Sequence, residues 1–153
     1  MELERVKGNT WVLKSWELIP LYQVDDTRCI LLDTGTVDQR AELEAALDQA
    51  GLTPVAILGS HAHIDHMGSY GYFQKTRGAV LALTLGEAGQ LFFPPGSAAA
   101  VLQSVPGGPF GQYPELESAP CLPDRIILPQ EREVTLCGVT FGLVRTPGHT
   151  VDH

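Results

Sequence analysis

The chain of 153 residues has few basic residues and no long apolar run. It carries 10 Lys and Arg residues against 18 Asp and Glu residues, which gives a formal net charge of -8 at pH 7. Nucleic acids and anionic membrane surfaces both reward clustered basic residues, so the composition argues against either as a partner. No apolar stretch approaches the roughly 20 residues of a membrane span. The first ten residues also lack the apolar stretch of a secretory signal, and we therefore expect a cytoplasmic protein.

Cysteine is scarce as well. The three residues, Cys29, Cys121 and Cys137, are odd in number and widely spaced, which does not suit a disulfide framework. None belongs to a C-x-x-C pair. We therefore expect buried free thiols without a role in metal binding or redox chemistry.

Short apolar runs separated by turn residues indicate alternating strands and helices. A β-meander is expected at 10–13, 18–24 and 28–32, and the last run is apolar enough for a strand covered on both faces. A helix follows, because Thr36 and Gln39 have capping-box spacing and Gly51 stands where a helix would stop. The remaining expected elements are a strand at 55–58, a helix from 70 to 75, and strands at 79–83, 125–128, 133–136 and 139–145. This order predicts an α/β (α+β) fold.

Residues 85–123 differ from the rest because Pro and Gly interrupt them repeatedly. So many breakers indicate a long excursion from the ordered elements, with one expected helix at 97–104. Two interpretations stay open: a lid over a site, or a solvent-exposed insertion without a role in chemistry. We expect residues 1–153 to form a single domain that contains this lid-like insertion.

Histidine is also rare, with five residues, yet three of them lie within six positions. His61 and His63 are separated by one residue, so on extended backbone both imidazoles point to one side and can bind one ion. Asp65 and His66 follow and offer an oxygen and a nitrogen ligand. Chance would give this pattern on the order of three times in ten thousand. The pattern predicts a metal site that suits Zn²⁺, with Fe²⁺ or Mn²⁺ as alternatives.

A further histidine, His149, follows Pro147 and Gly148 in what reads as a short rigid turn. If the strand at 139–145 pairs near the strand at 55–58, the loops that carry His149 and the histidine cluster open on the same edge of the sheet. Three imidazoles and one water would then complete a catalytic type of zinc site, which keeps one position for a nucleophile.

Three blocks of the chain resemble the metallo-β-lactamase-fold hydrolase superfamily, in the order found in that family. The blocks are Leu32-Asp33-Thr34-Gly35, His61-Ala62-His63-Ile64-Asp65-His66 and Thr146-Pro147-Gly148-His149-Thr150. The resemblance implies the N-terminal half of a four-layer αββα sandwich. It also implies that a first metal is bound by His61, His63 and His149, and a second by Asp65 and His66. Asp33 would orient the metal loop through hydrogen bonds.

The same resemblance implies a metal-dependent hydrolase with one or two zinc ions. In that family a water or hydroxide between two metals attacks a carbonyl or phosphorus centre, and Asp65 would act as the catalytic residue that orients or deprotonates the water. The expected substrate is a small ester, thioester, lactone or amide. The lack of a secretion signal disfavours an antibiotic-degrading enzyme, and the lack of a basic surface disfavours a nuclease. A glyoxalase-II-like thioesterase or a general cytoplasmic hydrolase is favoured over either.

The chain departs from the family pattern at its C-terminal end. The second half of the family's fold supplies a bridging aspartate and a further histidine, and neither Asp152 nor His153 fits those roles. We therefore expect an incomplete domain, truncated after the third block, with a half-built second metal site and weak or absent activity. An uncovered apolar sheet face is expected to drive homo-oligomer formation, for example as a symmetric dimer.

Two other interpretations of function stay open. A mono-iron dioxygenase of the same superfamily would keep the same histidines. A di-iron flavoprotein partner is disfavoured, since that branch usually has Glu at the position of His63. The other open interpretation is a fragment that binds metal or a partner chain without catalysing a reaction.

Overall fold

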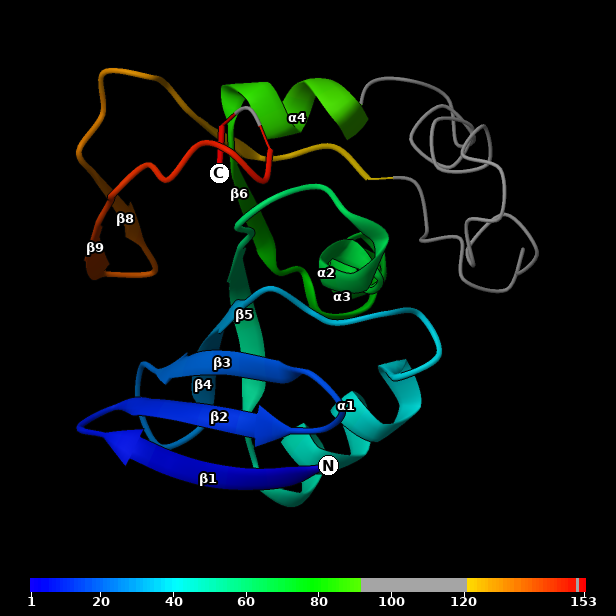
Figure 1. Cartoon of the computed structure of the whole chain (residues 1–153). Helices are drawn as coiled ribbons and strands as arrows, with labels where there is room; N and C mark the ends of the chain where they lie inside the picture. The colour runs from blue at the N-terminus through cyan, green and yellow to red at the C-terminus, as the bar shows by residue number, and fades with distance from the viewer. Residues whose placement is uncertain (92–120, 151) are drawn as a thin grey trace.

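A mixed sheet forms the centre of the molecule (Figure 1). The computed structural model describes residues 1–91, 121–150 and 152–153, so the helix expected at 97–104 and most of the excursion lie outside the described residues. Within them, seven strands make one sheet in chain order, antiparallel from β1 to β4 and parallel from β4 to β7. The strands are β1 (Glu2–Lys7), β2 (Thr10–Lys14), β3 (Leu18–Gln23), β4 (Arg28–Leu32), β5 (Thr53–Leu58), β6 (Val80–Thr84) and β7 (Arg125–Ile127).

Helices cover one face of this sheet. They are α1 (Arg40–Gln49), α2 (Ile64–Met67), α3 (Tyr70–Arg77) and α4 (Leu85–Leu91). Leu43 and Leu47 of α1 and Phe73 of α3 pack against Leu31 of β4 and Ile57 of β5, and all five side chains are buried. Burial of such side chains contributes about 1.5–3 kcal/mol each, so this layer supplies much of the stability that holds the strand ends in place.

The predicted helix boundaries are confirmed at one end of α1 and displaced at the other. Gly51 has a φ of +68°, and the Leu52 amide donates to the Leu47 carbonyl (2.9 Å), which is the hydrogen-bond pattern of a glycine-terminated helix. The Gln39 side chain accepts a hydrogen bond from the Thr36 amide (3.1 Å), as the capping-box spacing predicts, but regular helix begins only at Arg40.

A second, smaller sheet lies against the opposite face. β8 (Glu133–Leu136) and β9 (Val139–Gly142) form an antiparallel hairpin. Val134 and Leu136 are buried against Ile30, Ala56 and Ala82, which belong to β4, β5 and β6. The condition considered from the sequence, that 139–145 pairs near 55–58, is not met by strand pairing: β9 pairs with β8, and the apolar side of the hairpin packs on the sheet face instead of extending its edge. Among the described residues the layers are thus helices, a large sheet and a two-stranded second sheet, and the mixed α/β fold is confirmed.

The cysteines are free thiols, as expected, but they differ in exposure. Cys29 is buried in β4, Cys121 is half-buried and Cys137 is exposed. Cys137 (φ 49°) and Gly138 (φ 85°) form the tight turn of the β8–β9 hairpin, which requires left-handed backbone at both positions and leaves the Cys137 side chain at the surface. Among the described residues, no helix is both long and apolar enough to cross a membrane.

Candidate metal centre

The histidine cluster begins directly after β5, at the carboxyl end of a parallel strand. Asp33 follows β4 at the same edge of the sheet, and ligand sites of open α/β sheets form at this edge. The two loops are tied together, since the Thr34 amide donates to the His66 carbonyl (2.8 Å) and the Gly68 amide to the Gly35 carbonyl (2.8 Å). The fold therefore holds the first two sequence blocks side by side.

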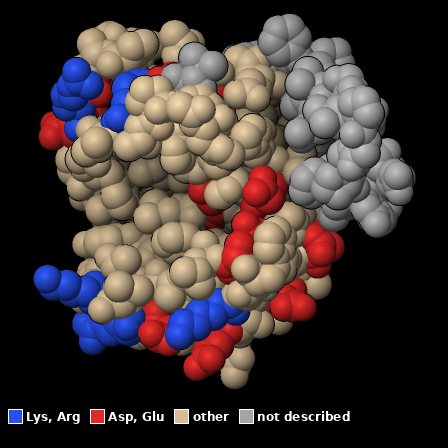
Figure 2. All heavy atoms as spheres, viewed as in Figure 1, with Lys and Arg blue, Asp and Glu red and all other residues tan. Residues whose placement is uncertain are grey.

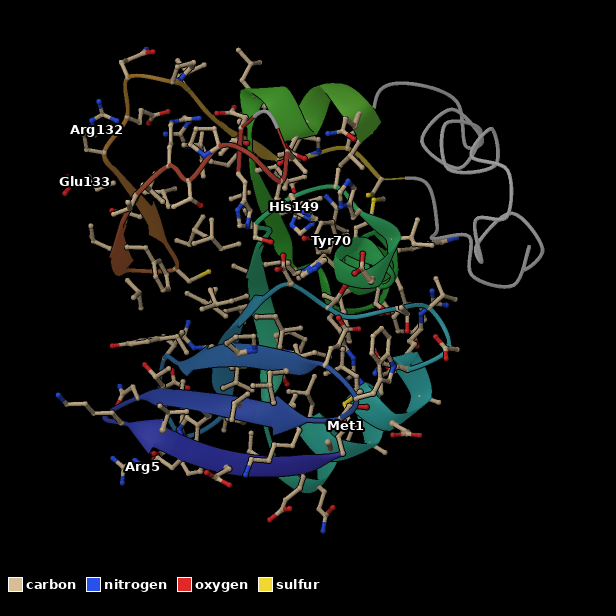
Figure 3. The ribbon with its side chains drawn as sticks, in the orientation of Figure 1. Met1, Arg5, Tyr70, Arg132, Glu133 and His149 are labelled. Carbon is tan, nitrogen blue, oxygen red and sulfur yellow. The ribbon has the colours of Figure 1, made fainter. Side chains whose placement is uncertain are left out.

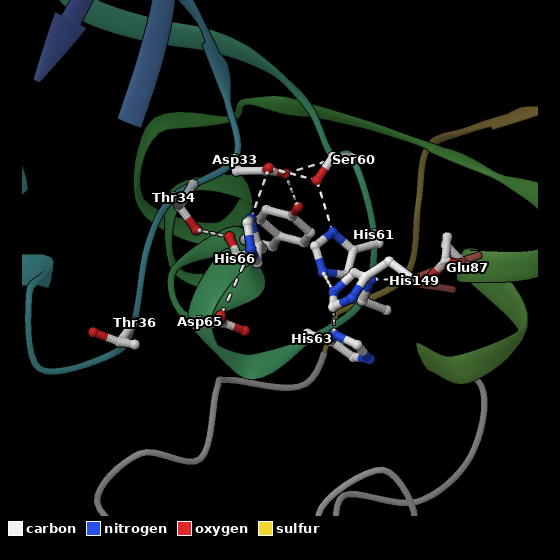
Figure 4. Close-up of polar contacts among 12 residues, drawn as sticks. Asp33, Thr34, Thr36, Ser60, His61, His63, Asp65, His66, Glu87 and His149 are labelled. Carbon is white, nitrogen blue, oxygen red and sulfur yellow. Dashed lines mark hydrogen bonds and ion pairs between the residues drawn. The ribbon is translucent and has the colours of Figure 1, made fainter. Parts of the chain in front are cut away.

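Three imidazole nitrogens meet at one point (Figure 4). His149 Nε2 lies 3.1 Å from His61 Nε2 and 3.1 Å from His63 Nδ1. One nitrogen can donate at most one proton, so His149 Nε2 cannot hydrogen-bond to both neighbours as a donor. Two nitrogens bound tetrahedrally to zinc at about 2.0–2.1 Å lie about 3.3 Å apart, close to the spacing seen here. The trio fits a zinc ion both in its donor atoms and in its spacing.

The carboxylate of Asp33 organises the ring orientations around this point. Its Oδ1 accepts from the Ser60 amide (2.7 Å) and the Tyr70 hydroxyl (2.6 Å), and its Oδ2 accepts from Ser60 Oγ (2.6 Å). Oδ2 also lies 3.0 Å from His66 Nδ1, and Ser60 Oγ lies 2.9 Å from His61 Nδ1. Asp33 adopts a φ of 67°, unusual for a residue other than glycine, and these contacts hold it there.

Hydrogen-bond directions in this network fix two tautomers. An ionised carboxylate only accepts hydrogen bonds, so Ser60 Oγ donates its hydrogen bond to Asp33. The same oxygen can then accept a hydrogen bond from the N–H group at His61 Nδ1. His66 Nδ1 donates to Asp33 in the same way. Both rings therefore carry their proton on Nδ1 and direct a lone pair outward from Nε2, which is the arrangement that metal-binding histidines adopt.

Electrostatics favour the neutral form of His61 and His63, whereas at His66 they favour the protonated ring until a metal displaces the Nε2 proton. Burial raises the pKa of Asp33, but hydrogen bonds from His66, Ser60 and Tyr70 outweigh it and hold that pKa below its usual value. Burial, together with neighbouring imidazoles, lowers the pKa of His61 to about 4 and also lowers that of His63. The hydrogen bond to Asp33 raises the pKa of His66. The histidines at 61 and 63 are therefore neutral at pH 7, and neutral imidazole is the form that binds metal.

Asp65 and His66 belong to a second group of metal-ligating side chains. His66 Nε2 lies 3.6 Å from Asp65 Oδ2, and the third member is Glu17, from the turn between β2 and β3. One ligand atom from each of the three residues lies within 4.8 Å of the others. The five residues that the sequence marked as ligands are thus divided between two groups, three in one and two in the other.

The segment that carries His149 is attached to β6 and α4 through Asp152. The Asp152 carboxylate pairs with Arg145 and accepts from the Gly86 amide (2.9 Å), while its carbonyl accepts from Thr84 Oγ1 (2.9 Å). His153 lies near the trio, with its ring centre 5.0 Å from that of His61, but its Nδ1 contacts Thr146 Oγ1 (3.1 Å). His153 is not among the residues of the two metal-ligating groups, and its exclusion as a ligand stays a prediction.

Glu87 supports the metal loop from α4, and sequence patterns did not mark it. It is 0% exposed, and its Oε2 accepts a hydrogen bond from the Ala62 amide (2.9 Å), between the two histidines. Ser60, Tyr70 and Glu17 were likewise not marked. Figure 3 shows Tyr70 and His149 pointing toward the centre of the molecule, where these elements meet. Of these four supporting residues, only Ser60 could be suspected from the sequence, because it lies next to the histidine motif.

Such a histidine-rich centre at the strand ends of an α/β fold is typical of metal-dependent hydrolases, and comparison with known proteins supports this class at the family level. The chain belongs to the metallo-beta-lactamase superfamily, whose family model matches residues 8–153. The resemblance seen in the sequence is therefore confirmed. A search of curated proteins finds no match.

Solved structures with the same fold include metallo-beta-lactamases from several sources. A subclass B3 enzyme of Bradyrhizobium japonicum is 21% identical with a TM-score of 0.75, and the match covers 99% of this chain and 54% of that one. A class B3 di-zinc enzyme from an Alaskan soil metagenome is 20% identical with a TM-score of 0.75, covering 99% and 55%. A third, from Novosphingobium pentaromativorans, is 25% identical with a TM-score of 0.75, covering 98% and 52%. The chain spans about half the length of the structures it matches.

Proposed function

We propose that the protein is a metal-dependent hydrolase of a small ester, thioester, lactone or amide, with its first zinc ion bound by His61, His63 and His149. The observation that carries the proposal is that His149 Nε2 lies 3.1 Å from a nitrogen of His61 and 3.1 Å from a nitrogen of His63, and that both of these rings are held neutral. Three nitrogen donors suit Zn²⁺, with Fe²⁺ or Mn²⁺ as alternatives. A three-ligand site also keeps a position for water, as catalytic zinc sites do.

A zinc ion bound there would lower the pKa of a water toward about 7 and polarise the substrate's oxygen. The chain's own groups would prepare this chemistry. Asp33 keeps His61 and His66 in the tautomers that leave Nε2 free, and Glu87 holds the backbone between the paired histidines. Asp65, which is only half-buried, would bind a second ion with His66 and accept a hydrogen bond or a proton from the attacking water.

The chemistry of the surroundings favours a small-molecule substrate. On the face shown in Figure 2, Lys and Arg side chains lie near the edges and form no continuous basic patch among the described residues. With a formal charge of -8, the protein offers little attraction to the phosphates of nucleic acids. We place its substrate among neutral or weakly charged carbonyl compounds for this reason.

Metal analysis combined with a substrate panel tests the proposal. Purified protein should contain zinc and hydrolyse at least one of an aryl ester, a thioester, a lactone or a β-lactam, and a His149→Ala variant should lose both the first zinc ion and the hydrolysis. Iron in place of zinc, with oxygen consumption and no hydrolysis, would indicate a mono-iron dioxygenase instead. Bound zinc without turnover of any panel member would favour a metal-binding role without catalysis.

A further inference from the structure

We propose that Glu17 is a ligand of the second metal site, which it forms together with Asp65 and His66. The inference rests on the proposed function in one respect, namely that the cluster after β5 binds metal. It goes beyond that function because it gives the second site three ligands from this chain, whereas the sequence blocks supply only two.

The position of Glu17 follows from the β2–β3 turn. The Ser15 amide donates to the Glu17 carbonyl (3.1 Å), which closes the turn, and Gln39 Nε2 donates to Ser15 Oγ (2.9 Å), which attaches the turn to the segment before α1. The Glu17 side chain then lies over Gly35. A Cβ atom at Gly35 would lie 3.2 Å from Glu17 Oε1, and the φ of +65° there favours glycine. Glycine in the first sequence block therefore gives the carboxylate room to approach the cluster.

The Glu17 side chain is half-buried, and one of its two carboxylate oxygens lacks a hydrogen-bond partner. Its Oε1 is buried and accepts no hydrogen bond from the described residues. No Lys or Arg within the described ranges forms an ion pair with Glu17 or Asp65. A buried carboxylate oxygen without a partner costs free energy, and a cation bound beside it would offset that cost.

The three donors are arranged as ligands of one ion. His66 Nδ1 is engaged by Asp33, so His66 Nε2 is the atom that faces Asp65 Oδ2 at 3.6 Å. One carboxylate oxygen of Glu17 lies within 4.8 Å of a ligand atom of each of these two residues. Metal-binding histidines commonly have this arrangement, in which a carboxylate holds the far ring nitrogen. The geometry points to a site of two carboxylates and one imidazole, close to but chemically distinct from the site of three imidazoles.

This ligand set predicts a difference between the two sites. Two anionic oxygens and one nitrogen form a harder site than three nitrogens. The second site should therefore bind Mn²⁺ relatively well, while the site of three histidines should prefer Zn²⁺ over Mn²⁺ more strongly. The second ion should also bind more weakly, because its ligands are only partly shielded from water.

Titration of the metal-free protein with Co²⁺, followed by visible absorption, and with Zn²⁺, followed by calorimetry, tests the inference. We expect two ions per chain in the wild type. Glu17→Gln should weaken the second ion at least tenfold and leave the first unchanged, and Glu17→Asp should restore part of the loss. The matched control is Glu133→Gln, which removes the same charge from an exposed side chain on β8, away from His149 (Figure 3), and should bind both ions as the wild type does.

A His149→Ala variant separates this inference from the proposed function. It should lose the first ion and keep the second, whereas Glu17→Gln should keep the first ion and bind the second more weakly. Wild-type-like binding of both ions by Glu17→Gln would overturn the role of Glu17 and leave the three-histidine site intact. Failure of the wild type to bind any ion would overturn the proposed function as well.

Discussion

Replacement of Asp33 by asparagine should impair both metal sites at once. The carboxylate accepts four contacts, from the Ser60 amide, the Tyr70 hydroxyl, Ser60 Oγ and His66 Nδ1, at 2.6–3.0 Å. Asparagine keeps one accepting oxygen, and its NH₂ group must donate where the second oxygen now accepts. With Oδ1 retained, Ser60 Oγ and His66 Nδ1 have to reverse their roles from donor to acceptor.

The reversal moves protons onto the nitrogens that face the metals. If His66 Nδ1 accepts, its proton moves to Nε2. If Ser60 Oγ accepts from the introduced amide group, it donates to His61 and drives that ring's proton to Nε2. Loss of such a supporting partner typically costs about 10–100-fold in metal affinity, which is about 1.4–2.7 kcal/mol per site. One or two lost charged hydrogen bonds should also lower the unfolding free energy by about 1.5–3 kcal/mol each.

Zinc competition against a chromophoric chelator measures the affinity, urea unfolding of the metal-free protein measures the stability, and long-range ¹⁵N–¹H NMR correlations identify the tautomers. Asp26→Asn, at an exposed turn position, is the control with the same charge change. The reasoning is refuted if Asp33→Asn binds zinc as the wild type does while the Nδ1–H tautomers of the histidines persist.

The remaining predictions concern the supports of the site and its pH dependence. Glu87→Ala should leave the Ala62 amide without its partner and lower the unfolding free energy by about 1–3 kcal/mol, measured by urea unfolding, whereas Glu87→Gln should be milder. Asp152→Ala should release the segment that carries His149 and weaken the first zinc ion several-fold in calorimetry, and an unchanged affinity would contradict this. His61 is neutral in the folded state down to a pKa of about 4 but takes up a proton near pH 6.5 when unfolded, so its contribution to stability should be lost as the pH falls from 6.5 toward 4. Urea unfolding of the metal-free wild type and of His61→Gln, each at pH 7 and pH 4.5, isolates the contribution of His61 to the pH dependence of stability. Self-association through the sheet face stays a prediction. Leu18 of β3 is 64% exposed and lies on the face of the large sheet opposite the helices, at a point that the β8–β9 hairpin does not cover. A monomer in light scattering would contradict self-association.

Much of the central sheet could be predicted because its apolar runs are local signals. The strand at 28–32 has the predicted bounds, since both of its faces are buried and no alternation obscures them. β1 was missed for the opposite reason: nearly every side chain of Glu2–Lys7 is exposed, and the strand is held by pairing with β2 alone. The placement of the hairpin was also missed, because a short alternating strand does not reveal which face it packs against.

The site was predictable only as far as its ligands are adjacent in sequence. His61, His63, Asp65 and His66 lie in one short block, so their pattern is visible without a structure. Their supports come from distant elements, such as Tyr70 on α3 and Glu87 on α4, where a buried polar residue looks the same as an exposed one in the sequence. Glu17 is the clearest case, since only the path of the β2–β3 turn brings it to the cluster.

The most direct test of the three-histidine centre is the zinc K-edge X-ray absorption spectrum of the protein loaded with one equivalent of zinc. Binding by His61, His63 and His149 predicts three imidazole nitrogens at about 2.0–2.1 Å with one further oxygen. A shell of oxygen atoms without imidazole scattering, or a spectrum unchanged in His149→Ala, would contradict the proposed metal centre.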